Sequence, residues 1–280
     1  MTPLTWLYVP GDRPQVVAKA LTAGADVVVI DLEDAVAPDR KAYARDATAE
    51  LLAEPQTQSP SRTQPVHVRI NALDGPLAAA DLAALATLPG LTGLRLPKVT
   101  SPAQITAIAE HTAPAAGGAL ALYALLETAL GVERAYEIAA AHPSLRGISL
   151  GETDLRADLG VRDDMGLDWS RSRVIVAARA ASLPPPSQSV HPDIRDLEGL
   201  AASCAHGRAL GFLGRAAIHP RQLPVIEQAY LPTAWEIEQA ETIVKAAAVE
   251  QGAQALPDGR FIDAAVVATA QRTLSLAHRI

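Results

Sequence analysis

The apolar residues of this chain fall into short runs that alternate with longer stretches of helical pattern. The runs predict strands at 4–9, 26–31, 66–70, 93–96, 120–126, 147–150 and 213–218. The stretches between them predict helices at 15–23, 39–53, 77–88, 102–111, 132–141, 170–181 and 196–210. About eight such units favour an α/β fold closed into a (β/α)8 TIM barrel over a doubly wound sheet. No GxGxxG motif follows a predicted strand, which argues against a dinucleotide-binding fold.

The end of the chain departs from this alternation. We expect the barrel domain at 1–231, followed at 232–280 by helices over 234–250 and 264–278 with a turn at 257–260. This length exceeds what a barrel requires, so the segment is predicted to be a lid or an oligomerisation contact. The polar stretch 54–64 is predicted to be an exposed loop.

Composition and charge narrow the classes of partner. Hydrophobic residues make up 49% and aromatic residues 4%, so the core is expected to be aliphatic. The net charge is −7, with 24 Lys and Arg against 31 Asp and Glu, which predicts no nucleic-acid partner. The single cysteine, the lack of a signal-peptide pattern and the lack of an apolar run of about 18 residues predict a cytoplasmic protein without a membrane segment.

Three acids gather at the end of the most apolar predicted strand. In VVVIDLEDAV, Asp31, Glu33 and Asp34 follow four β-branched residues. Carboxylates this close repel one another unless a metal, arginines, hydrogen bonds or helix amino-termini compensate them. The structural alternative is that Asp34 caps the next helix and Glu33 is solvated.

Polar residues also end the other predicted strands. In a parallel barrel the carboxyl ends of the strands meet at one mouth, so these side chains should converge. Two acids on different strands, Glu127 and Asp154, suit Mg²⁺, whereas no His or Cys cluster has zinc spacing. For any one of these acids, helix capping is the alternative role. Arg69 suits a carboxylate ligand and can offset developing charge, and its alternative is a salt bridge to Glu33 or Asp34.

Seven motifs carry a family resemblance. They are LYVPGDRP, DLEDAVAPDRKAYAR, VRIN, LPKV, LLETALGV, GETDLRADLG and GFLGRAAIHPRQ. In order and approximate spacing they resemble the citrate lyase β-subunit-like proteins of the HpcH/HpaI aldolase group, from about Leu7 to Ala270. The resemblance implies a trimeric or hexameric (β/α)8 barrel in which Mg²⁺ helps to cleave a carbon–carbon bond of a 3-hydroxyacyl thioester.

The resemblance also implies roles for the reacting centre. Glu127 and Asp154 would bind the metal, and Arg69 would bind the oxygens of the keto-acid part. Glu33 and Asp34 would hold metal-bound water and Arg69. The acids of the DLED motif would then support the metal site without binding the metal themselves.

Further roles follow from the same resemblance. Arg13, Lys19, Arg40 and Lys41 would face the phosphates and adenine of coenzyme A. Asp263, in DGRFIDAAVVATA, would reach a neighbouring subunit's site as acid or base, with the N-cap of the last helix as its structural alternative.

Three positions depart from the family pattern. Gln188 stands where an Asp is usual, Arg215 where Lys is common, and Glu152 where a small residue is frequent. The amide at 188 loses a charge, while arginine at 215 retains one. Glu152 is expected to add a third acid near the metal and to narrow the pocket.

The expected activity is a Mg²⁺-dependent carbon–carbon lyase acting on a short 3-hydroxyacyl-CoA of the malyl-CoA or citramalyl-CoA type. It would release acetyl-CoA or propionyl-CoA and a 2-oxo acid. One alternative is a citryl-thioester lyase β-subunit that works on an acyl carrier protein. Another is a non-catalytic CoA-ester-binding paralogue, motivated by Gln188. Condensation or thioester hydrolysis is also compatible, because the same enolate serves several reactions.

Overall fold

The computed structural model describes residues 2–59, 62–112, 120–249, 254–255 and 259–279. Backbone contacts divide the chain into two compact units, Pro3–Glu227 and a second made of Met1–Thr2 with Gln228–Ile280. Each unit is considered by itself.

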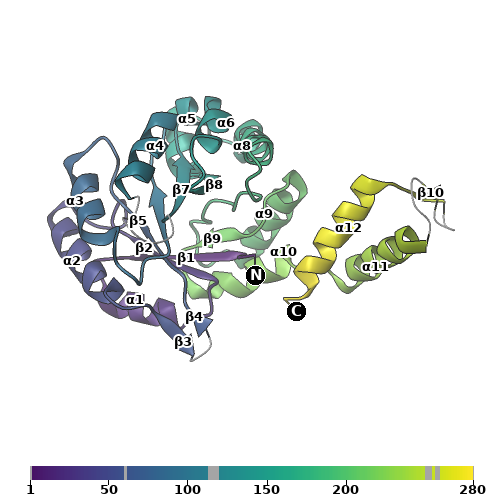
Figure 1. Cartoon of the computed structure of the whole chain (residues 1–280), viewed down its shortest axis with the longest axis horizontal. Coiled ribbons are helices and arrows are strands. Elements are labelled where there is room, and N and C mark those ends of the chain that lie inside the picture. Colours follow the sequence, from purple (N-terminus) through teal and green to yellow (C-terminus); the bar gives the residue numbers. More distant parts are fainter. Residues whose placement is uncertain (1, 60–61, 113–119, 250–253, 256–258, 280) are drawn as a thin grey trace. The chain divides into compact units, whose positions relative to one another are not determined.

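A curved parallel sheet forms the centre of the larger unit, and helices surround it (Figure 1). Its strands run in the order β8-β7-β6-β5-β2-β1-β9. Their bounds are β1 Thr5–Pro10, β2 Val27–Asp31, β5 Val66–Arg69, β6 Gly93–Leu96, β7 Ala121–Leu126, β8 Leu145–Leu150 and β9 Arg215–Ala217. An isolated parallel bridge between Gln188 and Arg215 places a further extended segment beside β9, in the seventh strand position along the chain. The predicted (β/α)8 barrel architecture is confirmed.

Helices follow the strands as the alternation predicted. They are α1 Pro14–Leu21, α2 Lys41–Leu52, α3 Pro76–Leu85, α4 Pro102–His111, α5 Ala129–Glu133, α6 Ala135–Ala139, α7 Glu152–Leu159, α8 Asp168–Ala180, α9 Leu197–Leu210 and α10 Leu223–Tyr230. Short 3-10 turns occur at η1 Pro38–Arg40, η2 Asp164–Leu167 and η3 Pro220–Gln222. The central strand β2 is buried at every position, as expected for a parallel strand covered on both faces.

Local sequence signals explain several helix boundaries. Ser101 and Gln104 form a capping box at the start of α4, whose bounds match the prediction. Thr128 caps α5 by accepting a hydrogen bond from the Gly131 amide at 3.1 Å. The predicted helix 132–141 is instead two short helices that meet at Arg134.

Two further expectations are corrected. The acids of GETD do not simply end a strand, because they form the first turn of α7, where carboxylates interact favourably with the helix dipole. Part of the predicted loop 54–64 is an antiparallel pair of short strands, β3 Thr57–Ser59 and β4 Arg62–Thr63.

The smaller unit contains α11 Ala234–Val249 and α12 Ala264–Ala277, which pack against each other (Figure 1). The short strands β10 Gln254–Ala255 and β11 Phe261–Ile262 pair antiparallel between them. Residues 257–258 of the predicted turn lie outside the described residues. Among the described helices, none combines the length and apolar character needed to cross a membrane.

Candidate active site

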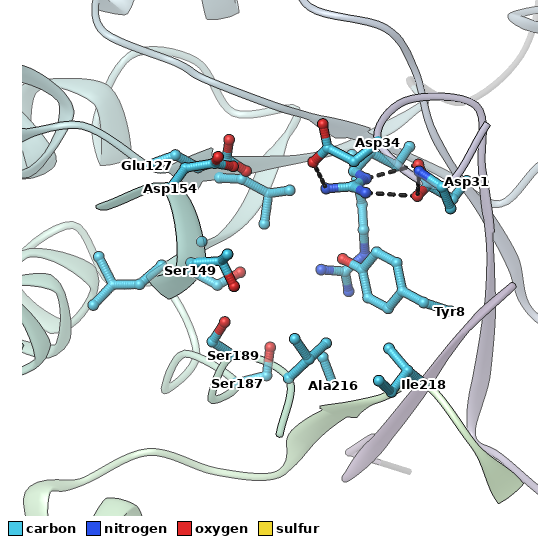
Figure 2. A pocket seen from close by; sticks show the side chains of 18 of the residues that line it. Tyr8, Asp31, Asp34, Glu127, Ser149, Asp154, Ser187, Ser189, Ala216 and Ile218 are labelled. Atoms are coloured by element: carbon cyan, nitrogen blue, oxygen red, sulfur yellow. Dashed lines mark hydrogen bonds and ion pairs between the residues drawn. The ribbon is translucent and has the colours of Figure 1, made fainter. Parts of the chain in front are cut away.

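A cavity of about 530 Å³ opens where the strands of the barrel end. Its wall includes residues from or just after β1, β2, β5, β7, β8 and β9. Figure 2 shows Glu127 and Asp154 on one side of this cavity and Asp31 and Asp34 on another. The predicted convergence of strand-terminal polar residues is therefore found at this mouth.

Arg69 is held by the acids of the β2 loop. Its Nε and Nη2 donate to the two carboxylate oxygens of Asp31 at 2.8 and 2.6 Å. Nη1 lies 3.1 Å from Glu33 Oε2 and 3.2 Å from Asp34 Oδ2. These hydrogen bonds raise the pKa of Arg69 in spite of its burial. Neither alternative for the loop holds, since Glu33 is 5% exposed and Asp34 pairs with Arg69 rather than capping a helix.

Register explains why Asp31 is the main partner. Asp31 and Arg69 are paired residues of the neighbouring strands β2 and β5. The backbone amides of Glu33 and Ala35 also donate to Asp31, at 2.9 and 3.1 Å. Asp31 thus orients Arg69, a role that the sequence analysis did not predict.

Lys98 ends the predicted strand at 93–96, so it is expected at the same mouth, and it joins this cluster. Its Nζ donates to Glu33 and lies 3.6 Å from Asp34 Oδ1 and 4.0 Å from Glu127 Oε2. The backbone of Lys98 has φ 51°, a left-handed conformation uncommon outside glycine. The charge of Lys98 connects the DLED acids with Glu127.

Glu127 is a deeply buried acid of the cavity. The residue is 2% exposed, and its Oε2 has no hydrogen-bond partner among the described residues. Burial, followed by the charge of Glu33, raises the pKa of Glu127 to about 8. Gly151 makes room for it, because a Cβ there would lie 2.5 Å from Glu127 Cγ.

These features fit a divalent cation. No cluster of three or more His, Cys, Asp or Glu side chains able to hold a metal occurs in the described part of the chain. Glu127 and Asp154 lie on the same side of the cavity (Figure 2), and the charge of Asp154 contributes to the raised pKa of Glu127. A buried carboxylate oxygen without a hydrogen-bond partner is a ready ligand. Two hard oxygen ligands with water and substrate oxygens completing the shell is the arrangement typical of Mg²⁺. The residues present therefore fit the predicted ion.

Metal binding should depend on pH through Glu127. Because only the ionised carboxylate binds a cation, and its pKa is about 8, Mg²⁺ must displace a proton below that pH. We expect the apparent Kd to fall up to about tenfold per pH unit as pH rises towards 8 and then to level off. Calorimetry in two buffers of different ionisation enthalpy measures the released proton directly. An affinity that does not change over this range would contradict the assignment of Glu127.

Comparison with known proteins decides the family. Residues 4–220 match the family model described as HpcH/HpaI aldolase/citrate lyase. The chain belongs to the HpcH/HpaI aldolase/citrate lyase family. The chain is 36% identical to a (3S)-malyl-CoA thioesterase of Cereibacter sphaeroides, covering 98% of this chain and 94% of the relative. It is 37% identical to a citrate lyase subunit beta-like protein of Mycobacterium tuberculosis, covering 96% and 93%.

A solved structure agrees with these relatives. The crystal structure of protein CitE from Mycobacterium tuberculosis in complex with magnesium, acetoacetate and coenzyme A has a TM-score of 0.81 and 37% identity. The match covers 99% of this chain and 98% of that chain. The predicted class, a Mg²⁺-dependent CoA-ester lyase, is confirmed at the level of the family.

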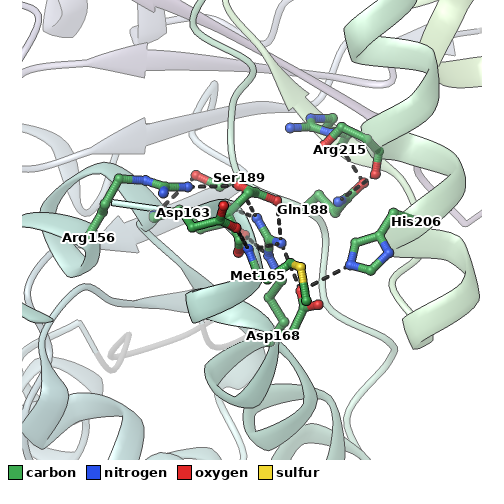
Figure 3. A network of polar contacts seen from close by, with 12 residues as sticks. Arg156, Asp163, Met165, Asp168, Gln188, Ser189, His206 and Arg215 are labelled. Atoms are coloured by element: carbon green, nitrogen blue, oxygen red, sulfur yellow. Dashed lines mark hydrogen bonds and ion pairs between the residues drawn. The ribbon is translucent and has the colours of Figure 1, made fainter. Parts of the chain in front are cut away.

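Gln188, the departure that raised doubt about catalysis, is one of the residues that line the cavity, and its amide group contacts Ser203 and Arg215. Its Nε2 donates to the Ser203 carbonyl at 3.1 Å, and its Oε1 accepts from Arg215 Nη1 at 3.3 Å. The neighbouring Ser187 and Ser189 line the cavity (Figure 2), as alternation along an extended segment requires. In Figure 3 Gln188 and Arg215 lie beside the helix that carries His206, which is α9. Gln188, which stands in place of the usual acid, therefore packs between β9 and α9.

A substitution at Gln188 should consequently affect stability rather than chemistry. In Gln188→Ala the buried Arg215 loses an acceptor, and we expect a loss of about 2 kcal/mol in the free energy of unfolding. The kcat should stay within about threefold of the parent, because the amide hydrogen-bonds to Ser203 and Arg215, which are not among the proposed metal ligands. Denaturant titration measures the change in the free energy of unfolding, and steady-state kinetics measure kcat. A large loss of kcat in a folded variant would contradict the structural role.

Glu152 is not among the residues that line the cavity. Arg171, with a side chain 3% exposed, binds both Glu152 oxygens at 2.9 and 2.7 Å. The same arginine contacts Asp164 and Asp168, the latter shared with His206 (Figure 3). The interpretation of Glu152 as a third acid that narrows the pocket is therefore wrong, because its charge is neutralised on the α8 side.

The predicted CoA-binding cations have different surroundings. Arg13 and Lys19 are exposed on and before α1, and Arg40 lies 4.1 Å from the centre of the Tyr43 ring. Lys41 donates to the carbonyls of Leu32 and Glu33 at 2.7 and 2.6 Å, so it supports the acidic loop. Contact of these four residues with coenzyme A stays a prediction.

Asp263 caps α12 in the smaller unit. Its Oδ1 accepts hydrogen bonds from the amides of Ala265 and Val266, both at 3.0 Å. The structural alternative is thus realised, and it uses one carboxylate oxygen only. The second oxygen leaves the predicted acid–base role compatible with the cap.

Proposed function

We propose that this protein cleaves a short 3-hydroxyacyl-CoA of the malyl-CoA or citramalyl-CoA type to acetyl-CoA or propionyl-CoA and a 2-oxo acid. The observation that carries the proposal is the buried oxygen of Glu127, which accepts no hydrogen bond from the described residues and lies in one cavity with Asp154 and Arg69. Bound there, Mg²⁺ supplies Lewis acidity towards the hydroxyl and carboxylate oxygens of the substrate. The relatives' magnesium complexes support the same choice of cation.

Arg69 supplies fixed positive charge next to the reacting oxygens. Asp31 accepts hydrogen bonds from two nitrogens of Arg69. The guanidinium is therefore oriented before the substrate binds and need not reorganise during the reaction. Glu33 and Asp34 are charge partners of Arg69 and Lys98 and keep both cations at the cavity. Burial raises the pKa of Glu33, while Arg69 and Lys98 lower that of Asp34 against the effect of burial.

Asp263 is the proposed acid or base for the carbinol proton and the thioester enolate. The carboxylate oxygen that the helix cap does not use and the family motif around Asp263 support this role. We propose that it acts in the cavity of a neighbouring copy within a homotrimer or hexamer, with residues 232–280 as the contact or lid. A cytoplasmic location accompanies the proposal as an expectation.

A product assay tests the function. Purified protein is incubated with malyl-CoA and citramalyl-CoA, with Mg²⁺ or with chelator, and the products are separated. Release of a 2-oxo acid together with acetyl-CoA or propionyl-CoA, only with Mg²⁺, is the expected result. Absence of turnover over a panel of such thioesters, including citryl-CoA, would refute the proposal.

Hydrolysis of the thioester is the second candidate. It is favoured by the relative named (3S)-malyl-CoA thioesterase, at 36% identity over nearly the whole chain. The same assay separates the two, because hydrolysis yields free coenzyme A and malate. A related candidate is action on an acyl carrier protein, suggested by a citrate lyase subunit beta of Leuconostoc mesenteroides subsp. cremoris at 34% identity. Co-purification with further subunits would favour that version.

The non-catalytic alternative was motivated by the absence of an acid at position 188. The amide of Gln188 hydrogen-bonds to Ser203 of α9 and to Arg215, which are not proposed metal ligands, so this motivation is weaker. Thermal stabilisation by CoA esters without any turnover would still reinstate it.

A further inference from the structure

The helix that carries Asp154 begins without a capping side chain. The N-cap residue of α7 is Gly151, which has no side chain to accept hydrogen bonds from the backbone amides of the first turn. A serine or aspartate cap does not fit there, because a Cβ at position 151 would lie 2.5 Å from Cγ of Glu127. The space that Glu127 occupies therefore excludes the usual means of holding the start of α7.

Two contacts of Glu152 hold this first turn instead. Its carboxylate oxygens accept hydrogen bonds from Nε and Nη2 of Arg171, at 2.9 and 2.7 Å. Its backbone amide donates to Oγ of Ser189 at 3.2 Å. Asp154 follows in the same helical turn, whose internal geometry is fixed. A displacement of Glu152 would consequently move Asp154 as well.

Arg171 is itself held firmly in place on α8. Its side chain is 3% exposed, and Nη1 donates to Asp164 Oδ2 at 2.8 Å and to Asp168 Oδ1 at 3.0 Å. A planar guanidinium that is bonded through all three nitrogens has one orientation. Arg171 therefore gives Glu152 a rigid partner in a neighbouring helix.

The other end of α7 is tied to the segment that carries Glu127. Asp158, in the last turn of α7, accepts a hydrogen bond from the backbone amide of Ala129 at 2.7 Å. Ala129 is the first residue of α5 and comes shortly after Glu127 in the chain. The separation of the carboxylates of Glu127 and Asp154 thus depends on how α7 is held at both ends.

This separation matters for the choice of cation. Mg²⁺ requires near-ideal octahedral geometry with oxygens at about 2.0–2.1 Å, whereas Ca²⁺ accepts flexible arrangements at about 2.3–2.6 Å. A first turn that cannot move favours the ion that tolerates less variation. Because a small residue is frequent at position 152 in the family, the carboxylate that holds this turn is a particular feature of this chain.

We propose that Arg171 is a positioning residue that, through Glu152, fixes Asp154 for Mg²⁺ and makes the site select Mg²⁺ over Ca²⁺. This inference rests on the proposed function, in which Glu127 and Asp154 bind the metal. Glu152 and Arg171 do not line the cavity, so their effect on the metal passes through the position of α7.

Calorimetric titrations of the full-length protein with Mg²⁺ and, separately, with Ca²⁺ test this role. In Glu152→Ala the Kd for Mg²⁺ should rise by about 10–100-fold, while the Kd for Ca²⁺ changes by less than about threefold. Glu152→Gln, whose amide oxygen can still accept a hydrogen bond from Arg171, should lie between Glu152→Ala and the parent. Arg171→Lys, which keeps the charge and loses the fork, should show the same selective loss for Mg²⁺.

The Glu152 variants should fold, because Arg171 keeps Asp164 and Asp168 as partners in both of them. Arg156→Ala is the matched control on the same helix. Arg156 pairs with Asp164 at 2.8 Å, but the two side chains are 33% and 61% exposed. Its loss should leave both metal affinities within about twofold of the parent.

Thermal unfolding distinguishes positioning from support of the fold. If the pair of Glu152 and Arg171 served stability alone, Glu152→Ala would lower Tm and keep the parent's ratio of Mg²⁺ to Ca²⁺ affinity. An equal loss of affinity for both ions, or no loss for either, in Glu152→Ala overturns the positioning role and leaves the lyase proposal standing. Failure of the parent protein to bind Mg²⁺ refutes the metal site, and this inference with it. The titrations contain no thioester, so a failure of the product assay leaves their result unaffected.

Discussion

Glu127→Gln should abolish detectable Mg²⁺ binding and lower kcat/KM by about a thousandfold or more, which corresponds to about 4 kcal/mol of transition-state stabilisation. The amide keeps the shape of the side chain but removes the charge that the cation requires. Oε2 of Glu127 accepts no hydrogen bond among the described residues and has only the ammonium of Lys98 at 4.0 Å, so the substitution breaks no described hydrogen bond of that atom. The loss should therefore appear as chemistry and metal affinity in a normally folded protein.

Glu33→Gln is the matched control for that result. Glu33 is buried as Glu127 is, but it pairs with Lys98 and Arg69. Substitution of a residue that supports the metal ligands without binding the metal typically lowers metal affinity or activity by about 10–100-fold. Titration of Mg²⁺ into both variants gives the ranking directly. Should Glu33→Gln be the more damaging of the two, the metal site belongs to the DLED loop instead.

Arg69→Met is expected to damage both stability and activity. The substitution leaves Asp31 and Glu33, whose side chains are 3% and 7% exposed, without their main cation. An ion pair of this burial costs about 3–5 kcal/mol when one partner is removed. Loss of a preorganised donor to developing oxyanion charge should lower kcat by about 100–1,000-fold. Denaturant midpoints and single-turnover rates measure the two effects.

The double variant Asp31→Asn with Arg69→Met separates these effects. It removes the buried charge together with its partner, so a large part of the lost stability should return. Activity should not return, because the cation at the reacting oxygens is still missing. Recovery of activity along with stability would show that Arg69 acts only through the fold.

The barrel could be predicted because its signals are local and repeated. Apolar runs such as Gly93–Leu96 and the capped helix Pro102–His111 have the bounds that the pattern indicated. The rule that parallel strands share one mouth then brought Asp31, Arg69 and Glu127 into one cavity before any contact was known.

The side-chain contacts that the sequence did not predict depend on strand register and on helices that lie far along the chain. The choice of Asp31 as the main partner of Arg69 follows from the pairing of β2 with β5, which composition does not encode. The partner of Glu152 is Arg171, one helix later, and no short-range spacing signals that pair. The direction of Gln188 is set by strand alternation in a segment too short and proline-rich to be recognised as a strand.

The packing of Gln188 against α9 has a consequence for how relatives of this protein can vary. A Cβ at Gly207 would overlap the amide group of Gln188, so the two positions share one volume. We therefore expect the residues at 188 and 207 to change as a pair among homologues. Where a shorter side chain occupies 188, alanine or serine becomes acceptable at 207, and a long side chain at 188 should always accompany glycine.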